Sequence, residues 1–354
     1  MTEGKARFYA YPAKVVSRGL PVFYNPAMEI NRDITILLLN SLPEKNIRAC
    51  DLLAGTGIRT LRMVLELHAN KLECLVSNDS NPMFPALLKK NMGLNNSKKR
   101  SGSQEKWNKL IIKNKDASML LLESSGFDYI DIDPFGSPNP FLDAACRRLG
   151  RAGILAVTAT DTSALCGSFP KACRRKYGAY PRHDYLMHEA GLRILIRKIQ
   201  MVAAQYEKAL EPVYCYSHEH HMRVFFRAKK QKTAVDFIIS KHEVWDGAGP
   251  LWTGRLWDPS LAKMMDKGVS TFPVSASMVN VIAEESQVDA LGFVDVHEVG
   301  KALHLPVLPR SVDVIKVVKE AGFKAERTHF SGSGIRTTMP FDDVNGIIKR
   351  LAGK

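Results

Sequence analysis

The sequence predicts a doubly wound α/β domain of the Rossmann-like type, followed by a smaller α+β C-terminal domain. Apolar segments of strand length alternate with helical stretches, the pattern of a mostly parallel sheet with helices on both faces. Four successive segments run into an acidic residue, and ligands of such sheets bind at the carboxyl ends of the strands. The segments expected as strands are residues 47–54, 72–79, 110–115, 127–133, 151–159 and 222–228.

The first strand and the turn after it form a nucleotide-type βα unit. Asp51 closes the strand, and Gly55 and Gly57 follow in a turn that lets the backbone approach a ligand closely. The third glycine of the dinucleotide fingerprint is missing, because Thr60 stands in its place, and NAD is therefore disfavoured. Arg59 lies at the start of the next helix, where the dipole favours anions, and is expected to help bind a carboxylate.

Acidic residues at the ends of the next two strands complete a plausible adenosyl pocket. Asp79 ends the second strand, roughly 20 residues beyond the glycine turn, which is the place of a ribose-binding acid. Asp116 ends the third strand, and with the small Ala117 it suits the amino group and the edge of adenine. In combination with the glycine turn, these residues predict S-adenosylmethionine as the cofactor.

The stretch from Asp131 to Pro138 reads Asp-Ile-Asp-Pro-Phe-Gly-Ser-Pro and brings a carboxylate, a carbonyl and an aromatic ring to the end of one strand. An exocyclic amine of a nucleobase is a poor nucleophile, and a carboxylate that accepts its N–H bond draws the lone pair out of the ring. We expect Asp133 and the Pro134 carbonyl to be the acceptors, and Phe135 to stack on a base taken out of its helix. Asp131 points the same way along the strand and stays an alternative acceptor, while an ordinary turn would use the same residue types.

With these motifs in place, the chain resembles the tRNA guanine-26 N2-dimethyltransferases of the Trm1 family, most of all the archaeal members, over nearly its whole length. The resemblance implies two successive methyl transfers to the amino group of a guanine at the junction of the D and anticodon stems. No Pro-Cys pair occurs in the chain, so a covalent enzyme intermediate is not expected. The matching strings are residues 23–33, 51–59, 131–138, 158–167, 171–178, 188–193, 248–254 and 328–337.

The resemblance also implies roles for single residues. Positions matching Arg32, Arg59, Asp79, Asp116 and Ala117 contact the cofactor, and those matching Phe23 and Asp133 serve methyl transfer. Arg32 follows Asn25-Pro26 in a turn-rich segment, and it is expected to pair with the cofactor carboxylate through two N–H donors. The alternative for Arg32 is an ion pair with Glu29 or Asp33. The alternative for Phe23 is a place in the core.

A formal net charge of +14 and a pI near 9.5 favour a polyanionic partner, and tRNA is the partner we predict. No obligate protein partner is expected, and the chain is expected to act as a monomer in the cytoplasm. No apolar run approaches the roughly 20 residues needed to span a bilayer, so no membrane association is predicted. The basic clusters expected to contact phosphates are residues 98–100, 147–151, 171–176 and 227–230.

Six cysteines are scattered without paired spacing, which predicts neither a disulfide framework nor a zinc site. No metal is therefore expected. The run His218-Glu-His220-His221 precedes an alternating strand-like segment, and its histidines are expected to face solvent or RNA.

Two domains are expected. Residues 1–228 would form the S-adenosylmethionine-dependent methyltransferase domain with an N-terminal substrate-site segment, and residues 229–354 the connector and a C-terminal tRNA-binding domain. Two other functions stay open. One is methylation of an amino group of adenine or cytosine in DNA, and the other is RNA binding by a module that retains a vestigial cofactor fold.

Overall fold

The centre of the molecule is a seven-stranded sheet in the order β5-β4-β3-β6-β7-β9-β8, in a computed structural model that describes residues 1–10, 24–96 and 103–353. The neighbouring strands from β5 to β7 pair in parallel, whereas β9 is antiparallel to both β7 and β8. This confirms the predicted α/β class. The strands are β3 (Ile47–Asp51), β4 (Leu72–Asn78), β5 (Leu110–Lys113), β6 (Phe127–Ile132), β7 (Leu149–Ala159), β8 (Lys208–His218) and β9 (His221–Lys230).

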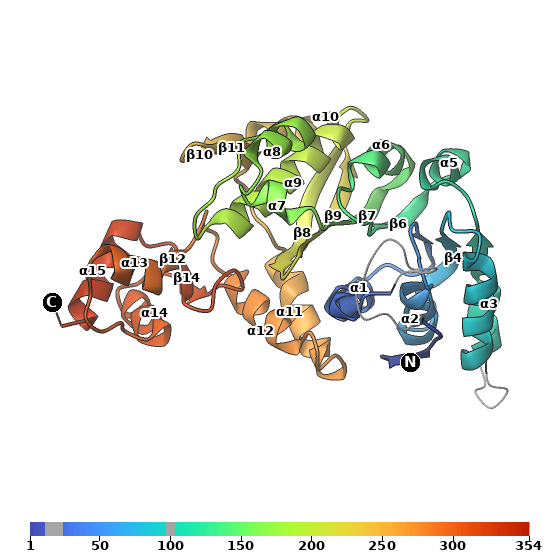
Figure 1. The fold of residues 1–354 in the computed structure, drawn as a ribbon, viewed down its shortest axis with the longest axis horizontal. Coiled ribbons are helices and arrows are strands. Elements are labelled where there is room, and N and C mark those ends of the chain that lie inside the picture. The colour runs from blue at the N-terminus through green and yellow to red at the C-terminus, as the bar shows by residue number, and fades with distance from the viewer. Residues whose placement is uncertain (11–23, 97–102, 354) are drawn as a thin grey trace.

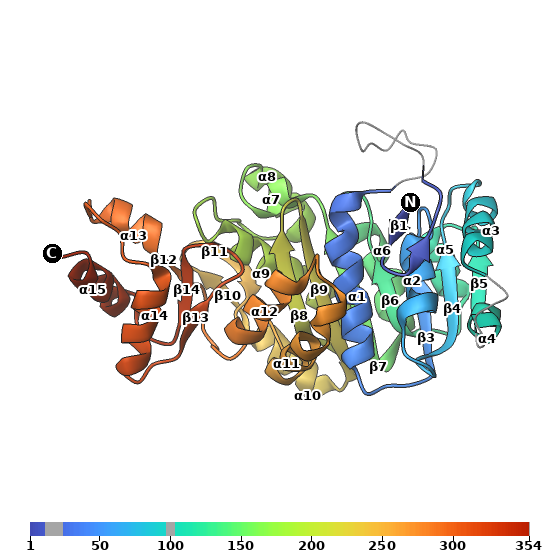
Figure 2. The ribbon, with the colours of Figure 1, turned by 90° about the horizontal axis from the view of Figure 1, so that it is seen from below.

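Helices cover both faces of this sheet (Figure 1). Figure 2 shows α1, α2 and α3 on one face, together with α11 and α12 from later in the chain, while α5, α6 and α9 lie behind the sheet. The helices on the first face are α1 (Glu29–Ser41), α2 (Ile58–Glu66), α3 (Phe84–Asn95), α11 (Pro259–Gly268) and α12 (Ala276–Glu285). Those behind it are α5 (Ala117–Glu123), α6 (Asn139–Arg148) and α9 (Met187–Ala204).

The central strands are apolar because both of their faces are covered. In β6 every residue except Asp128 is buried, and the strand lies between β3 and β7. The remaining elements surround this core. They are α4 (Ser103–Asn108), α7 (Thr162–Leu165), α8 (Pro170–Tyr177), α10 (Lys232–Ser240), the hairpin of β1 (Thr2–Glu3) with β2 (Ala6–Arg7), and the hairpin of β10 (His242–Trp245) with β11 (Ala248–Trp252).

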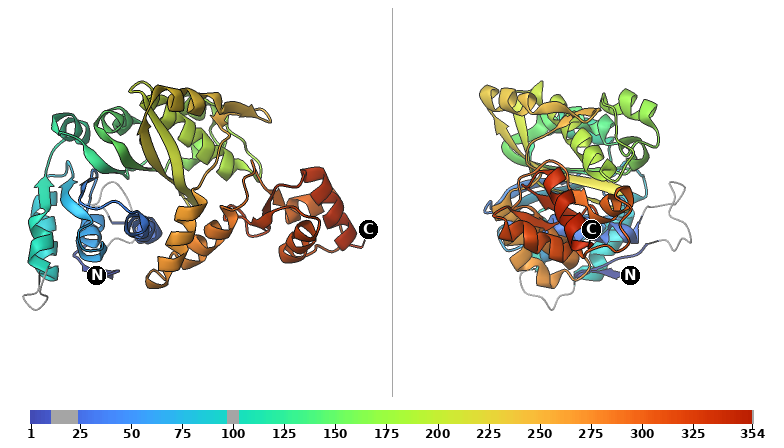
Figure 3. Two further views of the ribbon diagram at one scale, coloured as in Figure 1. Left: turned by 180° about the vertical axis from the view of Figure 1, so that it is seen from behind. Right: turned by 90° about the vertical axis from the view of Figure 1, so that its left-hand side faces the viewer.

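A smaller α+β unit forms the end of the molecule that carries the C-terminus (Figure 1; Figure 3, left). Its antiparallel sheet has the order β12-β14-β13, and it has a separate cluster of core residues between Val294 and Ile348. The elements are β12 (Val294–Asp295), α13 (Val296–Ala302), α14 (Ser311–Glu320), β13 (Ala325–Arg327), β14 (Gly334–Thr337) and α15 (Phe341–Leu351).

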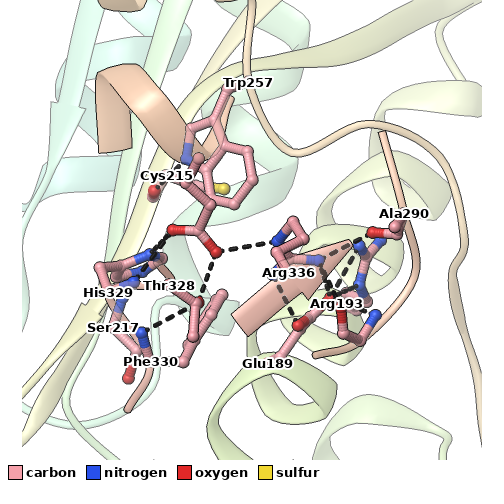
Figure 4. Close-up of polar contacts among 12 residues, drawn as sticks. Glu189, Arg193, Cys215, Ser217, Trp257, Ala290, Thr328, His329, Phe330 and Arg336 are labelled. Carbon is pink, nitrogen blue, oxygen red and sulfur yellow. Dashed lines mark hydrogen bonds and ion pairs between the residues drawn. The ribbon is translucent and has the colours of Figure 1, made fainter. Parts of the chain in front are cut away.

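A buried set of charges joins this unit to the rest of the chain (Figure 4). Arg336 of β14 donates to Glu189 of α9 at 2.8 Å and to Glu285 of α12 at 2.8 Å, and all three side chains have no exposed surface. His329 lies 2.7 Å from the other oxygen of Glu285. Because buried charges are stable only when they are paired, these contacts fix how the two units meet.

The structure differs from the expected organisation in three places. Arg32 lies in helix α1, not in a turn-rich segment, and β8 was not expected as a strand. The main cluster of core residues continues past residue 228, where we expected the first domain to end, as far as Ile282. The packing therefore changes from one unit to the other between Ile282 and Val294.

Candidate active site

A cavity of about 560 Å³ opens at the carboxyl ends of the parallel strands. Its walls come from the loops after β3, β4, β6 and β7, from the start of α1, and from the turn between β8 and β9. This is the edge of the sheet at which ligands bind in open α/β folds. Of the residues predicted for the site, those that line the cavity are Arg32, Asp51, Gly55, Arg59, Asp79, Asp133, Pro134 and Phe135.

The glycine turn after β3 folds as the sequence predicts. Gly55 and Gly57 have φ values of 55° and 76°, in the left-handed region that side chains with a Cβ rarely occupy. Asp79 at the end of β4 holds this turn, because its Oδ2 accepts the N–H of Gly55 at 2.8 Å and its Oδ1 accepts that of Asn81 at 2.9 Å. A carboxylate has about four acceptor positions, so Asp79 can still accept hydroxyl groups of a ligand.

Asp51 lies at the floor of the cavity and is 2% exposed. The Thr60 hydroxyl donates to its Oδ2 at 2.6 Å. Burial raises the pKa of Asp51 to about 6, against the opposing effect of Arg59, and the nearby Asp131 raises it further. Thr60, the residue in place of the third glycine, therefore serves to hold this acid.

Asp116 and Ala117 are not part of the cavity wall formed by the described residues. Asp116 caps α5, since its Oδ1 accepts the N–H of Met119 at 3.0 Å. The end of β5 nevertheless lies beside the end of β4, because Asn114 donates to the carbonyl of Asp79 at 2.6 Å. The two predicted adenine-binding residues are thus neighbours of the ribose-binding candidate but lie outside the cavity itself.

Asp133 and Asp131 have different surroundings. The side chain of Asp133 is 17% exposed and lines the cavity, and its Oδ2 accepts from Arg59. Asp131 is buried and accepts hydrogen bonds from Nη1 and Nη2 of Arg223, at 2.9 and 2.7 Å, and from the Tyr129 hydroxyl at 2.5 Å. Burial alone would raise the pKa of Asp131, but Arg223 and Arg59 lower it below its usual value. Of these two acids, the geometry thus leaves Asp133 in contact with the cavity.

The loop after Asp133 is fixed to the end of β7. The Gly136 N–H donates to the Thr160 hydroxyl at 2.6 Å, and the Thr160 N–H donates to the Gly136 carbonyl at 3.0 Å. Pro134 and Phe135, just before this anchor, line the cavity, and Phe135 is 41% exposed. The structure therefore brings the predicted carboxylate, carbonyl and aromatic ring to one place.

Helix α1 supplies another wall of the cavity. Arg32 lines it, but its guanidinium is bound to Glu3 of the N-terminal hairpin by two hydrogen bonds, at 2.6 and 2.5 Å. Neither Glu29 nor Asp33, the partners considered from the sequence, is the residue that binds it. Phe23 lies outside the described residues, and the next residue, Tyr24, lines the cavity and packs on Phe8 at a ring distance of 4.9 Å.

The sequence did not indicate several residues of the site. Thr35 of α1 accepts from Arg59 at 2.8 Å and from Arg223 at 3.1 Å, and so joins the two guanidinium groups. Glu219, His220 and His221 line the cavity, and His221 is 3% exposed. Of the two expectations for these histidines, exposure to solvent therefore does not hold for His221, while contact with RNA stays a prediction. The strand alternation of β9, which puts residues 221 and 223 on one face, could have indicated both His221 and Arg223.

Two of the predicted basic clusters meet at the other end of the parallel strands, where these strands begin. A second hollow, of about 280 Å³, is lined by Arg147, Arg148 and Arg151 together with Lys230. Lys208 also lines it, but the Lys208 ammonium group donates to carbonyls at the end of α6 and is buried. Residues 98–100 fall in a part of the chain that the structure does not describe.

Within the described parts of the chain, no group of three or more His, Cys, Asp and Glu side chains is placed to hold a metal ion. No helix of residues 1–10, 24–96 and 103–353 is both long and apolar enough to cross a membrane.

Known proteins resemble this chain over nearly its full length. The family model described as "N2,N2-dimethylguanosine tRNA methyltransferase" matches residues 4–246 and 241–349. A tRNA (guanine(26)-N(2))-dimethyltransferase from Pyrococcus furiosus is 38% identical, with 96% of this chain and 95% of the relative covered. A tRNA (guanine(26)-N(2)/guanine(27)-N(2))-dimethyltransferase from Aquifex aeolicus is 33% identical, with 94% and 90% covered.

A solved structure gives the same result for the fold. The complex of Trm1 from Pyrococcus horikoshii with S-adenosyl-L-methionine matches with a TM-score of 0.87 and 33% identity, covering 98% of this chain and 99% of that one. The fold and the cavity at the strand ends, with these matches, define a methyltransferase of the Rossmann-like α/β class. The chain belongs to the N2,N2-dimethylguanosine tRNA methyltransferase family.

Proposed function

We propose that this protein transfers methyl groups from S-adenosylmethionine to the N2 amino group of guanine 26 in tRNA, first once and then a second time. The names of the relatives support the nucleotide, the atom and the dimethyl product, and the solved relative supports the methyl donor. The net charge of +14 supports a nucleic-acid substrate. We assign the C-terminal unit to tRNA binding, and all groups used in the proposal come from one chain.

The position of Asp133 is the observation that carries this proposal. Asp133 lines the cavity beside Pro134, and Arg59 holds its Oδ2 atom in place. A carboxylate has a second oxygen, so Oδ1 is the acceptor that we assign to an N–H of the guanine amine, with the Pro134 carbonyl as the other acceptor. Both acceptors would turn the nitrogen lone pair toward the methyl group, and the Asp133 carboxylate would take up the proton that the amine loses.

Other residues of the site fit the cofactor. The left-handed glycine turn lets a ligand approach the backbone, and Asp79 keeps acceptor positions for ribose hydroxyls. S-adenosylmethionine would supply an electrophilic methyl group bound to sulfur. We propose Arg32 and Arg59 as partners of its carboxylate, which would share them with Glu3 and Asp133. Asp51 and Gly57 stay proposed cofactor residues, as do Asp116 and Ala117 for adenine.

A guanine inside a tRNA helix cannot reach the floor of this cavity, so the base must leave its stack. Phe135 is exposed at the cavity wall and offers a ring on which a flipped base can stack. Phe23, which is outside the described residues, is proposed to serve the same site. Direct transfer from sulfur to nitrogen then needs no covalent bond between enzyme and base.

The purified protein, S-adenosylmethionine and an unmodified tRNA transcript provide the direct test. Nucleoside mass spectrometry with mapping of the modified position should find N2-methylguanosine early and N2,N2-dimethylguanosine later, both at position 26. Methylation of DNA adenine or cytosine instead would contradict the proposed substrate. Tight tRNA binding without any methylation would point to the vestigial RNA-binding module.

Two substitutions test methyl transfer and cofactor binding separately. Asp133→Ala should lower the methylation rate by about 10²-fold or more, because the acceptor that activates the amine is lost, while the affinity for S-adenosylmethionine stays nearly the same. Asp79→Ala should weaken cofactor binding first, which calorimetry measures. Full activity of the Asp133 variant, or unchanged cofactor affinity of the Asp79 variant, would refute the role of that residue.

A further inference from the structure

His221 is a buried polar side chain in the wall of the cavity for which the chemistry above has no use. It is 3% exposed, and its Nε2 atom has no hydrogen-bond partner among the described residues. Its ring makes edge-to-face contacts with those of Tyr216 and His218, at centroid distances of 5.6 and 5.9 Å. A buried polar atom without a partner costs free energy, and a ligand that bonds to Nε2 would remove this cost.

The direction of β9 explains how His221 reaches the site. Because β9 is antiparallel to β7, it begins at the edge of the sheet where β6 and β7 end, and Met222 pairs with Ala159. Residues 221 and 223 lie on the same face of the strand. Arg223 binds Asp131 across the sheet, and Asp133 lies two residues beyond Asp131 on that face. His221 therefore faces the part of the cavity that contains Asp133.

The surroundings keep this imidazole neutral. Burial lowers the pKa of His221 to about 4, and the positive charges of Arg223 and Arg59 act in the same direction, against the opposing effect of Asp133. A neutral imidazole has one N–H donor and one lone pair. His221 can therefore accept a hydrogen bond at physiological pH, which an imidazolium cannot do.

We propose that His221 selects guanine by accepting the N1–H bond of the flipped base at Nε2, while Asp133 accepts an N–H of the neighbouring amino group. This rests on the proposed methylation of guanine N2. The N1 and N2 atoms are adjacent on the Watson–Crick edge of guanine and both carry hydrogens, so two acceptors side by side match that edge. Purines with a 2-amino group but no hydrogen on N1 would leave the lone pair of His221 facing the lone pair of N1.

The test uses two synthetic tRNAs that carry either guanosine or 2-aminopurine at position 26. 2-Aminopurine keeps the amino group and has no hydrogen on N1. For the unaltered protein, kcat/KM should be about 10-fold or more higher for guanosine, because a site built to accept a hydrogen rejects an analogue without it. In His221→Phe this ratio should fall to about 3 or less, with most of the loss in methylation of guanosine.

Two further variants separate base selection from a structural role. His221→Gln keeps an acceptor at the end of the side chain and should recover part of the selectivity. His242→Phe is the matched control, since burial also lowers the pKa of His242 to about 4 and its Nε2 is bonded to Gln200 at 2.8 Å, away from the cavity. It should keep the selectivity of the unaltered protein even if it is less stable.

Each outcome either supports or contradicts the selection of guanine by His221. A reduced ratio in His221→Phe with an unchanged ratio in His242→Phe supports selection by His221. Undiminished preference for guanosine in His221→Phe overturns it, as does an unaltered protein that methylates both tRNAs equally well, a result that does not require the variant to fold. Failure of the unaltered protein to methylate either tRNA would instead overturn the proposed function.

Discussion

Three acids and two guanidinium groups lie at or beneath the floor of the cavity, and the acids do not have equal shares of the positive charge. Arg223 and Arg59 both interact with Asp131, and Arg59 also binds Asp133. Asp51 is left with a neutral donor, the Thr60 hydroxyl, for its direct hydrogen bond. This explains why burial and the neighbouring Asp131 carboxylate raise the pKa of Asp51 to about 6.

The raised pKa of Asp51 predicts a pH dependence of stability. The folded protein holds this proton more tightly than the unfolded chain, so the contribution of Asp51 to stability is complete below about pH 4 and is lost as the pH rises through about 6. Asp51→Asn removes this loss. The free energy of unfolding of the variant, measured with urea, should gain about 1 kcal/mol on the unaltered protein between pH 5 and pH 7.

The matched control for this comparison is Asp236→Asn on the exposed surface of α10, which should show no such gain over the same range of pH. Parallel pH curves for the Asp51 variant and the unaltered protein would mean that Asp51 is already ionised in the folded state at pH 5.

At the scale of single residues, the sequence could indicate which side chains lie together where they belong to one local motif. Asp133, Pro134 and Phe135 follow one another in the chain, and the structure places all three in the cavity wall. The partner of Asp131 could not be found in this way, because Arg223 lies 92 residues away in the sequence. Only the pairing of β7 with β9 brings that guanidinium to the acid.

Among the elements, the turn between β3 and α2 depends most on residue type. Gly57 has a φ of 76°, and a Cβ added there would lie 2.6 Å from Cδ1 of Leu88 on α3. The backbone conformation and the packing of α3 on this turn thus both require glycine at this position.

Gly57→Ala should destabilise the protein by about 1–3 kcal/mol and weaken cofactor binding, because the turn must move to admit the Cβ. Gly93→Ala is the control within the neighbouring helix, where a Cβ meets no atom within 4 Å. That change should stabilise the protein by about 0.5–1 kcal/mol. Thermal unfolding with and without S-adenosylmethionine measures both effects, and equal stability of the two variants would contradict the argument from φ.

The elements that the sequence failed to indicate have physical reasons. β8 contains Glu211 and Pro212, and its pairing with β9 is irregular between Pro212 and Tyr214. It lies at the edge of the sheet, where a proline is tolerated. Helix α1 follows a short 3₁₀ turn that starts at Pro26, so its first residues look like a turn. The five parallel strands were found because their sequences are rich in apolar residues, and the central ones, β3 and β6, are almost entirely buried.

At the scale of the whole molecule, we expect a single substitution to lower stability most at the junction shown in Figure 4. Arg336 neutralises two carboxylates, Glu189 and Glu285, that have no exposed surface. Burial opposes ionisation of Glu285, but His329 and Arg336 lower its pKa to about 2. The expected boundary at residue 228 missed this arrangement, because a change in composition along the chain says nothing about α11 and α12 packing on the first core.

Arg336→Met should lower the free energy of unfolding by about 3–5 kcal/mol, because it removes the cation that two buried carboxylates share. Arg255→Met is the control, since the ion pair of Arg255 with Asp289 is more than half exposed on both sides. It should leave the urea midpoint unchanged. Similar midpoints for the two variants would show that water or a local rearrangement replaces Arg336.

The same junction determines when folding can be completed during synthesis of the chain. Glu189 lies 147 residues before Arg336, so a chain growing on the ribosome presents the helix that carries this acid long before its cation exists. Until β14 emerges, Glu189 can pair with Arg193 of the same helix but not with Arg336. Final assembly of the junction must therefore wait for synthesis to reach residue 336, even though every strand of the seven-stranded sheet is by then complete.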